Sequence, residues 1–258
     1  MDLDLSGKRA LVCGSSQGIG LAAAQELAEL GADVTVLARN EASLNEAIKS
    51  LNTSKSQKHT VLVADFFNTK QVQEIASSHN DFHILVNNTG GPPGGLAVDA
   101  DIEEFRIAFN AHLINNQVLA QALIPFMKSS GFGRIINIIS TSVKAPLAGL
   151  GVSNTIRGAV NSWSKTLANE LGQYGITVNN VLPGATKTAR LDSIIANKAS
   201  KANQDKEIIE NAMKSEIPAK RFGSPAEVGA AVAFLASPAA GYINGVSITV
   251  DGGRTGCF

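Results

Sequence analysis

A glycine-rich segment near the start of the chain has the residue types and spacing to bind phosphate. Residues Gly14–Gly20 read Gly-Ser-Ser-Gln-Gly-Ile-Gly and follow the apolar run Ala10–Cys13. Glycine permits a tight turn and lets the backbone approach a ligand closely. A helix beginning here would direct free N–H groups and its positive dipole end at an anion. Rather than a plain surface turn, the pattern predicts a pyrophosphate site made by Gly14, Ser16, Gly18, Ile19 and Gly20.

An arginine follows the second apolar run, at the point where dinucleotide-binding folds meet the adenosine ribose. The run Val34–Leu37 is followed by Arg39, and no Asp or Glu occurs before Glu41. An acidic residue at this point would bind the 2′-hydroxyl, whereas arginine accommodates a 2′-phosphate. The sequence therefore favours NADP(H) over NAD(H) as cofactor. The alternative is a surface arginine that ends a strand.

Short apolar runs alternate with helical patterns along the chain and must position these residues. The runs are rich in β-branched residues and apolar throughout, which is typical of strands buried on both faces. They are Ala10–Cys13, Val34–Leu37, Val61–Val63, Ile84–Val86, Ile135–Ile139, Val178–Leu182 and Val246–Val250. The alternation predicts an α/β fold: one domain over residues 1–258, a doubly wound parallel Rossmann sheet with helices on both faces.

Three segments between the runs have helical signatures. Residues 18–30 carry apolar side chains at helical spacing, and Ser224–Glu227 is a capping box with proline at the first helical position. Residues 194–220 predict a pair of surface helices. Because ligands bind beyond the carboxyl ends of such sheets, we interpret residues 189–220 as a helical lid over a cleft. A solvated helical insertion is the alternative.

The composition excludes several classes of protein. Hydrophobic residues make up 44% and charged residues 17%, and the net charge is zero, so no global field favours nucleic acid or an anionic membrane. No run offers the ~20 apolar residues needed to cross a bilayer. Cys13 and Cys257 indicate neither a disulfide framework nor a zinc site. We expect a cytoplasmic protein that binds a small-molecule substrate and no metal.

Further motifs occur in order over nearly the whole chain: Gly14/Gly18/Gly20, Asp65, Asn87–Gly90, Ser140, Asn179, Pro183-Gly184, Thr188, Arg221, Gly223 and Val250–Gly253. Together they resemble the motifs of the short-chain dehydrogenase/reductase family, most closely its 3-oxoacyl-carrier-protein reductase-like branch. The resemblance implies that Asp65 contacts the adenine ring and Thr188 the nicotinamide carboxamide. It also implies cofactor binding by Asn88, Gly90, Pro183 and Gly184, a catalytic role for Ser140, and a dimer or tetramer.

The chain departs from the family at three of its four catalytic positions. Family members carry Tyr-x-x-x-Lys, with the tyrosine thirteen residues after the catalytic serine. Here that count leads to Ser153, and four residues further to Arg157. The family's catalytic asparagine is replaced by His112. In the family the lysine holds the nicotinamide ribose, so the resemblance implies that Arg157 binds this ribose. Residues four apart share a helix face, which places Arg157 beside Ser153.

These replacements alter the source of the proton. A general acid works best with a pKa near the working pH, so a serine hydroxyl is a poor substitute for the tyrosine. Loss of one general acid typically lowers a rate by ~10²–10⁴-fold. His112 titrates near neutrality and Lys144 lies on the loop after Ser140, so either could supply the proton. The alternatives are a hydrogen-bonded helix histidine and a solvated lysine.

The loop Gly90–Gly95 combines four glycines with two prolines. Glycine allows close approach to a cofactor, and proline stiffens the backbone. We interpret the loop as a rigid wall beside the nicotinamide, with an ordinary surface turn as the alternative.

Three functions are compatible with this pattern. The first is an NADP(H)-dependent oxidoreductase acting on a carbonyl or alcohol, including 3-oxoacyl substrates, with a rearranged proton path. The second is a dinucleotide-binding protein without turnover, in a regulatory or scaffold role. The third is a non-redox enzyme, such as a dehydratase or lyase, that uses the cofactor structurally. The complete cofactor motifs and the retained Ser140 favour the first.

Overall fold

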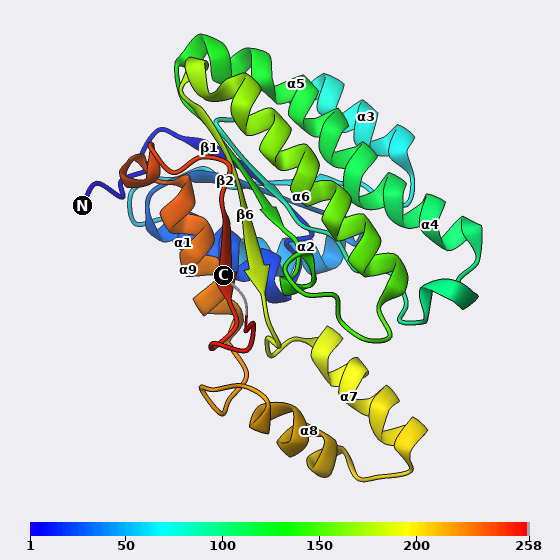
Figure 1. Ribbon diagram of the computed structural model, residues 1–258. Helices are drawn as coiled ribbons and strands as arrows, with labels where there is room; N and C mark the ends of the chain where they lie inside the picture. The colour runs from blue at the N-terminus through cyan, green and yellow to red at the C-terminus, as the bar shows by residue number, and fades with distance from the viewer. Residues whose placement is uncertain (257–258) are drawn as a thin grey trace.

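A seven-stranded parallel sheet forms the centre of the protein in the computed structural model, which describes residues 1–256 (Figure 1). The strands lie in the order β3-β2-β1-β4-β5-β6-β7. They are β1 Arg9–Cys13, β2 Asp33–Ala38, β3 Thr60–Val63, β4 Ile84–Asn87, β5 Gly133–Ile138, β6 Ile176–Pro183 and β7 Ser247–Val250. Each predicted apolar run overlaps one of these strands, which confirms the fold class. The strand order reverses between β1 and β4, where a doubly wound sheet opens a crevice for ligands.

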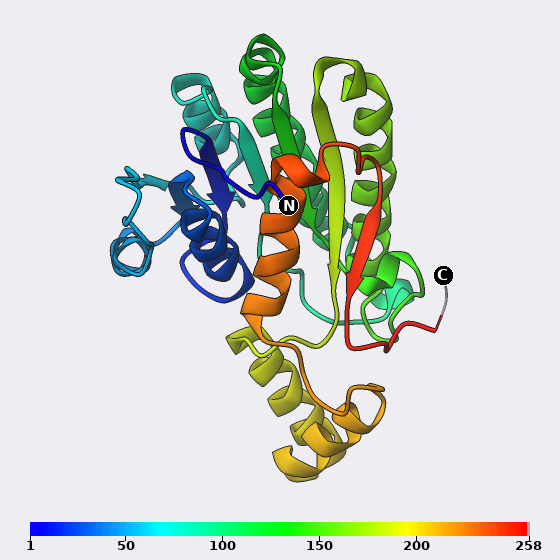
Figure 2. The same cartoon turned by 90° about the vertical axis from the view of Figure 1, so that its left-hand side faces the viewer.

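Helices cover both faces of the sheet (Figures 1 and 2). They are α1 Gly18–Glu29, α2 Glu41–Lys49, α3 Thr69–Ser78, α4 Ile102–Phe109, α5 Asn115–Ser130, α6 Gly151–Leu171, α7 Ala189–Ala202, α8 Lys206–Ser215 and α9 Pro225–Ala236. Side chains of α1, α2 and α9 pack in one hydrophobic core, and those of α3, α5 and α6 pack in the other. The sheet separates the two cores.

The strands supply alternate residues to these two cores. In β1, Ala10 and Val12 lie in the core of α1 and α9, while Leu11 and Cys13 lie in the core of α5 and α6. Successive side chains of a strand point to opposite faces, so a strand covered on both sides must be apolar at every position. This explains why the sequence shows apolar runs without alternation.

Asparagines form a hydrogen-bonded ladder across the half of the sheet that β4, β5, β6 and β7 make. The Nδ2 atom of Asn87 donates to Oδ1 of Asn137 at 2.8 Å, and Asn137 donates in turn to Asn180 at 3.0 Å. Asn180 donates to the hydroxyl of Ser247 at 3.1 Å. The four residues occupy matching positions on β4, β5, β6 and β7. Because buried amides require partners, the ladder fixes the register of these strands.

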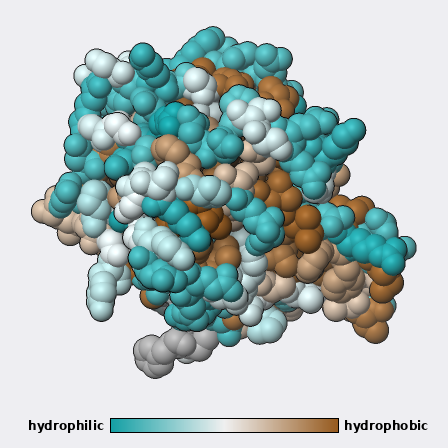
Figure 3. All heavy atoms as spheres, turned by 90° about the horizontal axis from the view of Figure 1, so that it is seen from above, coloured by the Kyte–Doolittle hydropathy of each residue, from teal (hydrophilic) through white to brown (hydrophobic). Residues whose placement is uncertain are grey.

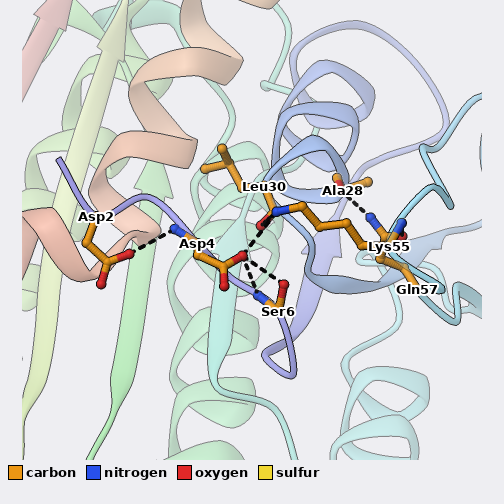
Figure 4. Close-up of polar contacts among 7 residues, drawn as sticks. All are labelled: Asp2, Asp4, Ser6, Ala28, Leu30, Lys55 and Gln57. Carbon is orange, nitrogen blue, oxygen red and sulfur yellow. Dashed lines mark hydrogen bonds and ion pairs between the residues drawn. The ribbon is translucent and has the colours of Figure 1, made fainter.

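The amino-terminal segment is tied to neighbouring loops at the amino end of the sheet (Figure 4). The Nζ atom of Lys55 donates to Oδ1 of Asp4 at 3.1 Å and to the carbonyl of Leu30 at 3.4 Å. Gln57 donates to the carbonyl of Ala28 at 2.7 Å. These contacts join the chain before β1, the end of α1 and the segment before β3. They lie at the opposite end of the strands from the glycine-rich turn.

The last helix against the sheet, α9, begins with the predicted capping box. The backbone N–H of Ser224 donates to Glu227 at 2.8 Å, and the N–H of Glu227 donates to the Ser224 hydroxyl at 3.3 Å. The Arg221 guanidinium bonds both carboxylate oxygens of Glu227, at 2.8 and 2.6 Å. These contacts, led by Arg221, lower the pKa of Glu227 to about 2.

Helices α7 and α8 extend beyond the carboxyl edge of the sheet as a separate pair (Figure 2). They confirm the predicted surface helices, although α7 begins at Ala189 because the Thr188 hydroxyl caps it by accepting from the N–H of Leu191 at 3.4 Å. A small separate core contains Leu191 and Ile195 of α7 and Ile217 and Phe222 of the segment after α8; Ile209 and Met213 of α8 pack against it. The use of the two helices as a lid stays a prediction.

Exposed apolar side chains gather on α4 and the segment before it. They are Leu96, Val98, Ile102, Ile107 and Phe109. Figure 3 shows apolar surface on the right-hand side of the molecule, the side on which α4 lies in Figure 1. The oligomeric state stays a prediction.

Within residues 1–256 no helix has both the length and the apolar character needed to cross a bilayer. The same residues contain no cluster of three or more His, Cys, Asp or Glu side chains suited to a metal ion. Cys257 lies outside the described residues.

Candidate active site

The glycine-rich turn joins β1 to α1 and has no room for side chains at two of its glycines. Gly14 has a φ of +58°, and a Cβ atom there would lie 2.7 Å from the Asn88 side chain. A Cβ atom on Gly20 would collide with the carbonyl oxygen of Gly14. The chain can therefore make this tight turn only with glycine at these positions.

Two polar side chains, Ser15 of the turn itself and Asn88 after β4, tie this turn to the neighbouring strands. The Ser15 hydroxyl donates to the carbonyl of Val12 at 2.7 Å and accepts from the N–H of Leu37 at 2.9 Å. The Nδ2 atom of Asn88, just after β4, donates to the carbonyls of Cys13 and Gly14 at 3.3 and 3.1 Å. The side chain of Gln17 makes no capping bond at the start of α1. The first N–H groups of α1 are thus left for an anion.

A cleft of about 1010 Å³ opens above this turn at the carboxyl edge of the sheet. Most of the predicted cofactor-binding residues line it, together with three of the predicted catalytic ones. They are Gly14, Ser16, Gly18, Ile19, Arg39, Asp65, Asn88, Gly90, Ser140, Ser153, Arg157, Pro183, Gly184 and Thr188. The fold therefore brings segments from the ends of six strands, β1 to β6, into one cavity.

One part of the cleft lies at the ends of β2 and β3. Arg39 follows β2 and is exposed, and it belongs to none of the ion pairs found within residues 1–256. Asp65 follows β3, where its carboxylate accepts from the N–H of Phe67 at 3.0 Å. An uncommitted guanidinium at this place can take a 2′-phosphate.

Ser140, Ser153 and Arg157 line the same cleft. Ser140 follows β5, and its hydroxyl accepts from the N–H of Ser142 at 3.1 Å. Ser153 and Arg157 are one turn apart near the start of α6. The buried Arg157 donates from Nη1 to the carbonyl of Ile138 at 3.0 Å. Burial, with a smaller effect of the Arg190 charge, lowers the pKa of Arg157 to about 10, so the guanidinium stays protonated at neutral pH.

His112 lies behind the cleft and is not among its lining residues. It occupies a π-helical turn, Asn110–Ile114, between α4 and α5. Burial lowers the pKa of His112 most, and the positive charge of Arg157 lowers it further, to about 2. A hydrogen bond with the Gly90 backbone raises this pKa, but by less. The imidazole is therefore neutral at neutral pH.

Lys144 lies on the loop after the short helix Thr141–Val143 and is half-buried. It is not among the residues that line the cleft, and neither is Gly20. The catalytic roles predicted for His112 and Lys144 stay predictions.

The structure adds Arg190 to the cleft, a residue that the sequence analysis did not select. It is the second residue of α7, and its Nη2 atom donates to the carbonyl of Pro92 at 2.8 Å. The bond joins the start of α7 to the loop Gly90–Gly95, of which Gly90 and Gly91 line the cleft. The role of this loop as a rigid wall beside the nicotinamide stays a prediction. A positive side chain in the first turn of a helix is unfavourable beside the positive end of the helix dipole. This unusual placement is the feature of the sequence that could have pointed to Arg190.

The chain is similar over nearly its whole length to known reductases. A family model described as "Enoyl-(Acyl carrier protein) reductase" matches residues 14–255. The 3-oxoacyl-(acyl-carrier-protein) reductase FabG of Rickettsia bellii is 33% identical over 253 residues, covering 97% of this chain and 98% of that protein. The NADPH-dependent reductase BacG of Bacillus subtilis is 30% identical over 254 residues, covering 96% and 98%.

Solved structures are similar over the whole chain. The L-sorbose reductase of Gluconobacter frateurii, complexed with NADPH and L-sorbose, has a TM-score of 0.92 at 32% identity and is covered in full, as is this chain. YwfH, an NADPH-dependent reductase involved in bacilysin biosynthesis, has a TM-score of 0.90 at 30% identity, covering 98% of this chain and 100% of that one.

Proposed function

The chain belongs to the short-chain dehydrogenase/reductase family, and from this we propose that it is an NADPH-dependent oxidoreductase that reduces a carbonyl group on a small molecule. The observation that carries the proposal is the single cleft shared by Arg39, the glycine-rich turn and the Ser140–Ser153–Arg157 group. A dinucleotide bound along it would reach from Arg39 to the two serines.

The residues of the cleft fit NADPH. The turn excludes side chains at Gly14 and Gly20, and the start of α1 offers N–H groups to a diphosphate. Arg39 is the matching group for a 2′-phosphate. Two of the similar proteins, BacG and YwfH, are described as NADPH-dependent, and the sorbose reductase was solved with NADPH. These observations support NADPH over NADH.

The proposed roles of the site residues follow from their chemistry. When bound, NADPH supplies the hydride that reduces the carbonyl carbon. Ser140 and Ser153 donate hydrogen bonds to the carbonyl oxygen and orient it. The fixed positive charge of Arg157 stabilises the negative charge that develops on this oxygen. The residues thus polarise the carbonyl without an acidic tyrosine.

The proton in this proposal comes from water in the cleft. Neither serine is acidic enough to act as a general acid near neutral pH. His112 carries no ionised proton there, because its pKa is lowered to about 2. The oxygen is first stabilised as an anion by Arg157 and is then protonated. We expect this path to be slower than a tyrosine-assisted one by ~10²–10⁴-fold.

A second function is a dinucleotide-binding protein without turnover. Two observations favour it. His112 is buried and neutral. The described residues that line the cleft include no tyrosine or histidine, and their one lysine is Lys187. In this case the cofactor-binding residues would keep their roles, and Ser140 and Ser153 would have none in catalysis.

Fluorescence titration with NADPH and NADH, followed by NADPH oxidation assays with ketones, aldehydes, 3-oxoacyl thioesters and oxo acids, tests these proposals. Tight NADPH binding with turnover supports the oxidoreductase. Tight binding without turnover on any carbonyl favours the second function. Weak binding of both nucleotides would refute both.

A further inference from the structure

Two arginines from distant parts of the chain meet at one point of the cleft. Arg157 comes from α6 and Arg190 from the start of α7. A Cβ atom added to Gly91 would lie 3.8 Å from Nη2 of Arg157 and 3.9 Å from Nη2 of Arg190. Both guanidinium groups therefore border the same small space above Gly91.

The partners of these arginines leave their charges without compensation. Arg157 donates to the carbonyl of Ile138 and Arg190 to the carbonyl of Pro92, and both acceptors are neutral. Within residues 1–256 neither arginine takes part in an ion pair. Converging like charges destabilise each other, and the cost is greater where burial reduces screening. An anion placed between them would remove this repulsion.

The distribution of charge along the cleft separates this place from the adenosine end. The charged residues that line the cleft are Arg39, Asp65, Arg157, Lys187 and Arg190. Among residues 1–256 the only acidic one that lines the cleft is Asp65, which follows β3, the strand next to β2 and Arg39. No carboxylate among the described lining residues is therefore left to pair with Arg157 and Arg190.

The position of Arg157 places the anion close to the reacting carbonyl. Its backbone is one helical turn from Ser153, and its guanidinium is anchored on Ile138, two residues before Ser140. The cofactor diphosphate already has its own site at the glycine-rich turn and the start of α1. A guanidinium presents parallel N–H groups that match the two oxygens of a carboxylate.

We propose, building on the oxidoreductase function above, that the substrate is an oxo acid whose carboxylate is bound by Arg157 and Arg190 above Gly91. In the reaction the carbonyl carbon gains a hydride from NADPH and the carbonyl oxygen gains a proton from water. The products are a hydroxy acid, NADP⁺ and the hydroxide that the water leaves, which exchanges with solvent; the carboxylate is unchanged. Arg190 is thus a specificity-determining residue.

The test compares oxo acids with their neutral methyl esters. Phenylpyruvate, acetoacetate and levulinate separate the carboxylate from the ketone by increasing lengths, and each has a methyl ester of nearly the same shape. We expect kcat/KM to be about 10- to 100-fold higher for at least one acid than for its ester, as expected of a charge-assisted contact.

Arg190→Gln removes the charge from an exposed side chain, so the fold should tolerate it. It should lower kcat/KM for the preferred acid about 10- to 100-fold, mainly through KM, and leave the ester within about two-fold. Arg190→Lys, which keeps the charge without the fork, should recover part of the loss. Lys198→Gln is the matched control, because it removes an exposed charge from α7 at a residue that does not line the cleft.

Two binding measurements separate failure of this inference from failure of the proposed function. If Arg190→Gln weakens NADPH binding and lowers activity on acid and ester equally, Arg190 serves the cofactor and the inference is wrong, while the oxidoreductase stands. If no carbonyl is reduced, calorimetric titration of the NADP⁺-saturated protein with phenylpyruvate, acetoacetate and levulinate still tests whether the two arginines bind an anion. Binding of an acid that Arg190→Gln weakens at least about 10-fold supports the anion site. No binding of any acid refutes it.

Discussion

Replacement of Arg39 should separate the two nicotinamide cofactors. Arg39 is exposed at the end of β2, lines the cleft and forms no ion pair with the described residues. Arg39→Gln therefore breaks no ion pair among the described residues and, because the side chain is exposed, leaves no buried group without a partner. Any change in nucleotide affinity then reports the contact with the nucleotide.

The size of the effect follows from this exposure. A hydrogen bond to a charged group is stronger than a neutral one, but water and salt screen a pair at the surface. We expect Arg39→Gln to raise the Kd for NADPH about 5- to 30-fold and to change that for NADH less than about two-fold. Arg39→Asp should raise the Kd for NADPH further, because a carboxylate repels the 2′-phosphate.

Fluorescence titration of both nucleotides at low and high salt measures these changes. Higher salt should narrow the difference between wild type and Arg39→Gln, because screening weakens the lost contact. Arg106→Gln, on exposed α4, is the control and should change neither Kd. Equal effects of Arg39→Gln on NADPH and NADH would refute the assignment of Arg39 to the 2′-phosphate.

Three further substitutions test the site and the fold. Ser153→Tyr with Arg157→Lys should raise kcat for neutral ketones by ~10²-fold or more, and an unchanged kcat would show that the surrounding geometry no longer supports a tyrosine. The pKa of His112 is about 2 in the folded protein, against an ordinary value of 6.5. Between pH 6.5 and about pH 2, therefore, His112 is protonated in the unfolded chain but not in the folded one. From this cause the free energy of unfolding of the wild type should fall by about 2 kcal/mol between about pH 7 and about pH 5. In urea denaturation at these two pH values, the fall for His112→Asn should be smaller by about that amount. Equal falls for the two proteins would contradict the burial of His112. Asn137→Leu leaves Asn87 Nδ2 and Asn180 Oδ1 without partners and should lower the free energy of unfolding by about 2–5 kcal/mol, whereas exposed Asn197→Ala should change it by less than about 0.5 kcal/mol.

The strands could be predicted from the sequence because their physical cause is local. A parallel strand buried on both faces must be apolar along its length, and each apolar run overlaps a strand. The capping box Ser224–Glu227 was predictable for the same reason, since both partners lie within one helical turn. The glycine-rich turn was predictable from the spacing of its glycines, but the contacts of Asn88 and Leu37 that hold it come from distant parts of the chain.

The environment of His112 could not be predicted in this way. Its spacing matched a family position, but its burial depends on how α4, α5 and α6 pack around it. The π-helical turn at Asn110–Ile114 has no marker in the residue pattern. Its lowered pKa then follows from burial and from Arg157, which is distant in sequence.

Arg190 illustrates a second limit. Its acceptor, the carbonyl of Pro92, is 98 residues earlier in the chain. No helical or strand periodicity relates positions so far apart, and a backbone carbonyl carries no residue signature. The pairing became visible only once the fold had brought α7 to the loop Gly90–Gly95.

The separate small core of α7 and α8 has a consequence for how the protein opens. Its buried side chains Leu191, Ile195, Ile217 and Phe222 form a cluster distinct from the two cores that flank the sheet. Amide hydrogens of α7 and α8 should therefore exchange with solvent through local unfolding, at a lower free energy than those of β1, β4 and β5. The two helices should unfold together as one cooperative unit. A protease should therefore cleave within them while the sheet is still folded.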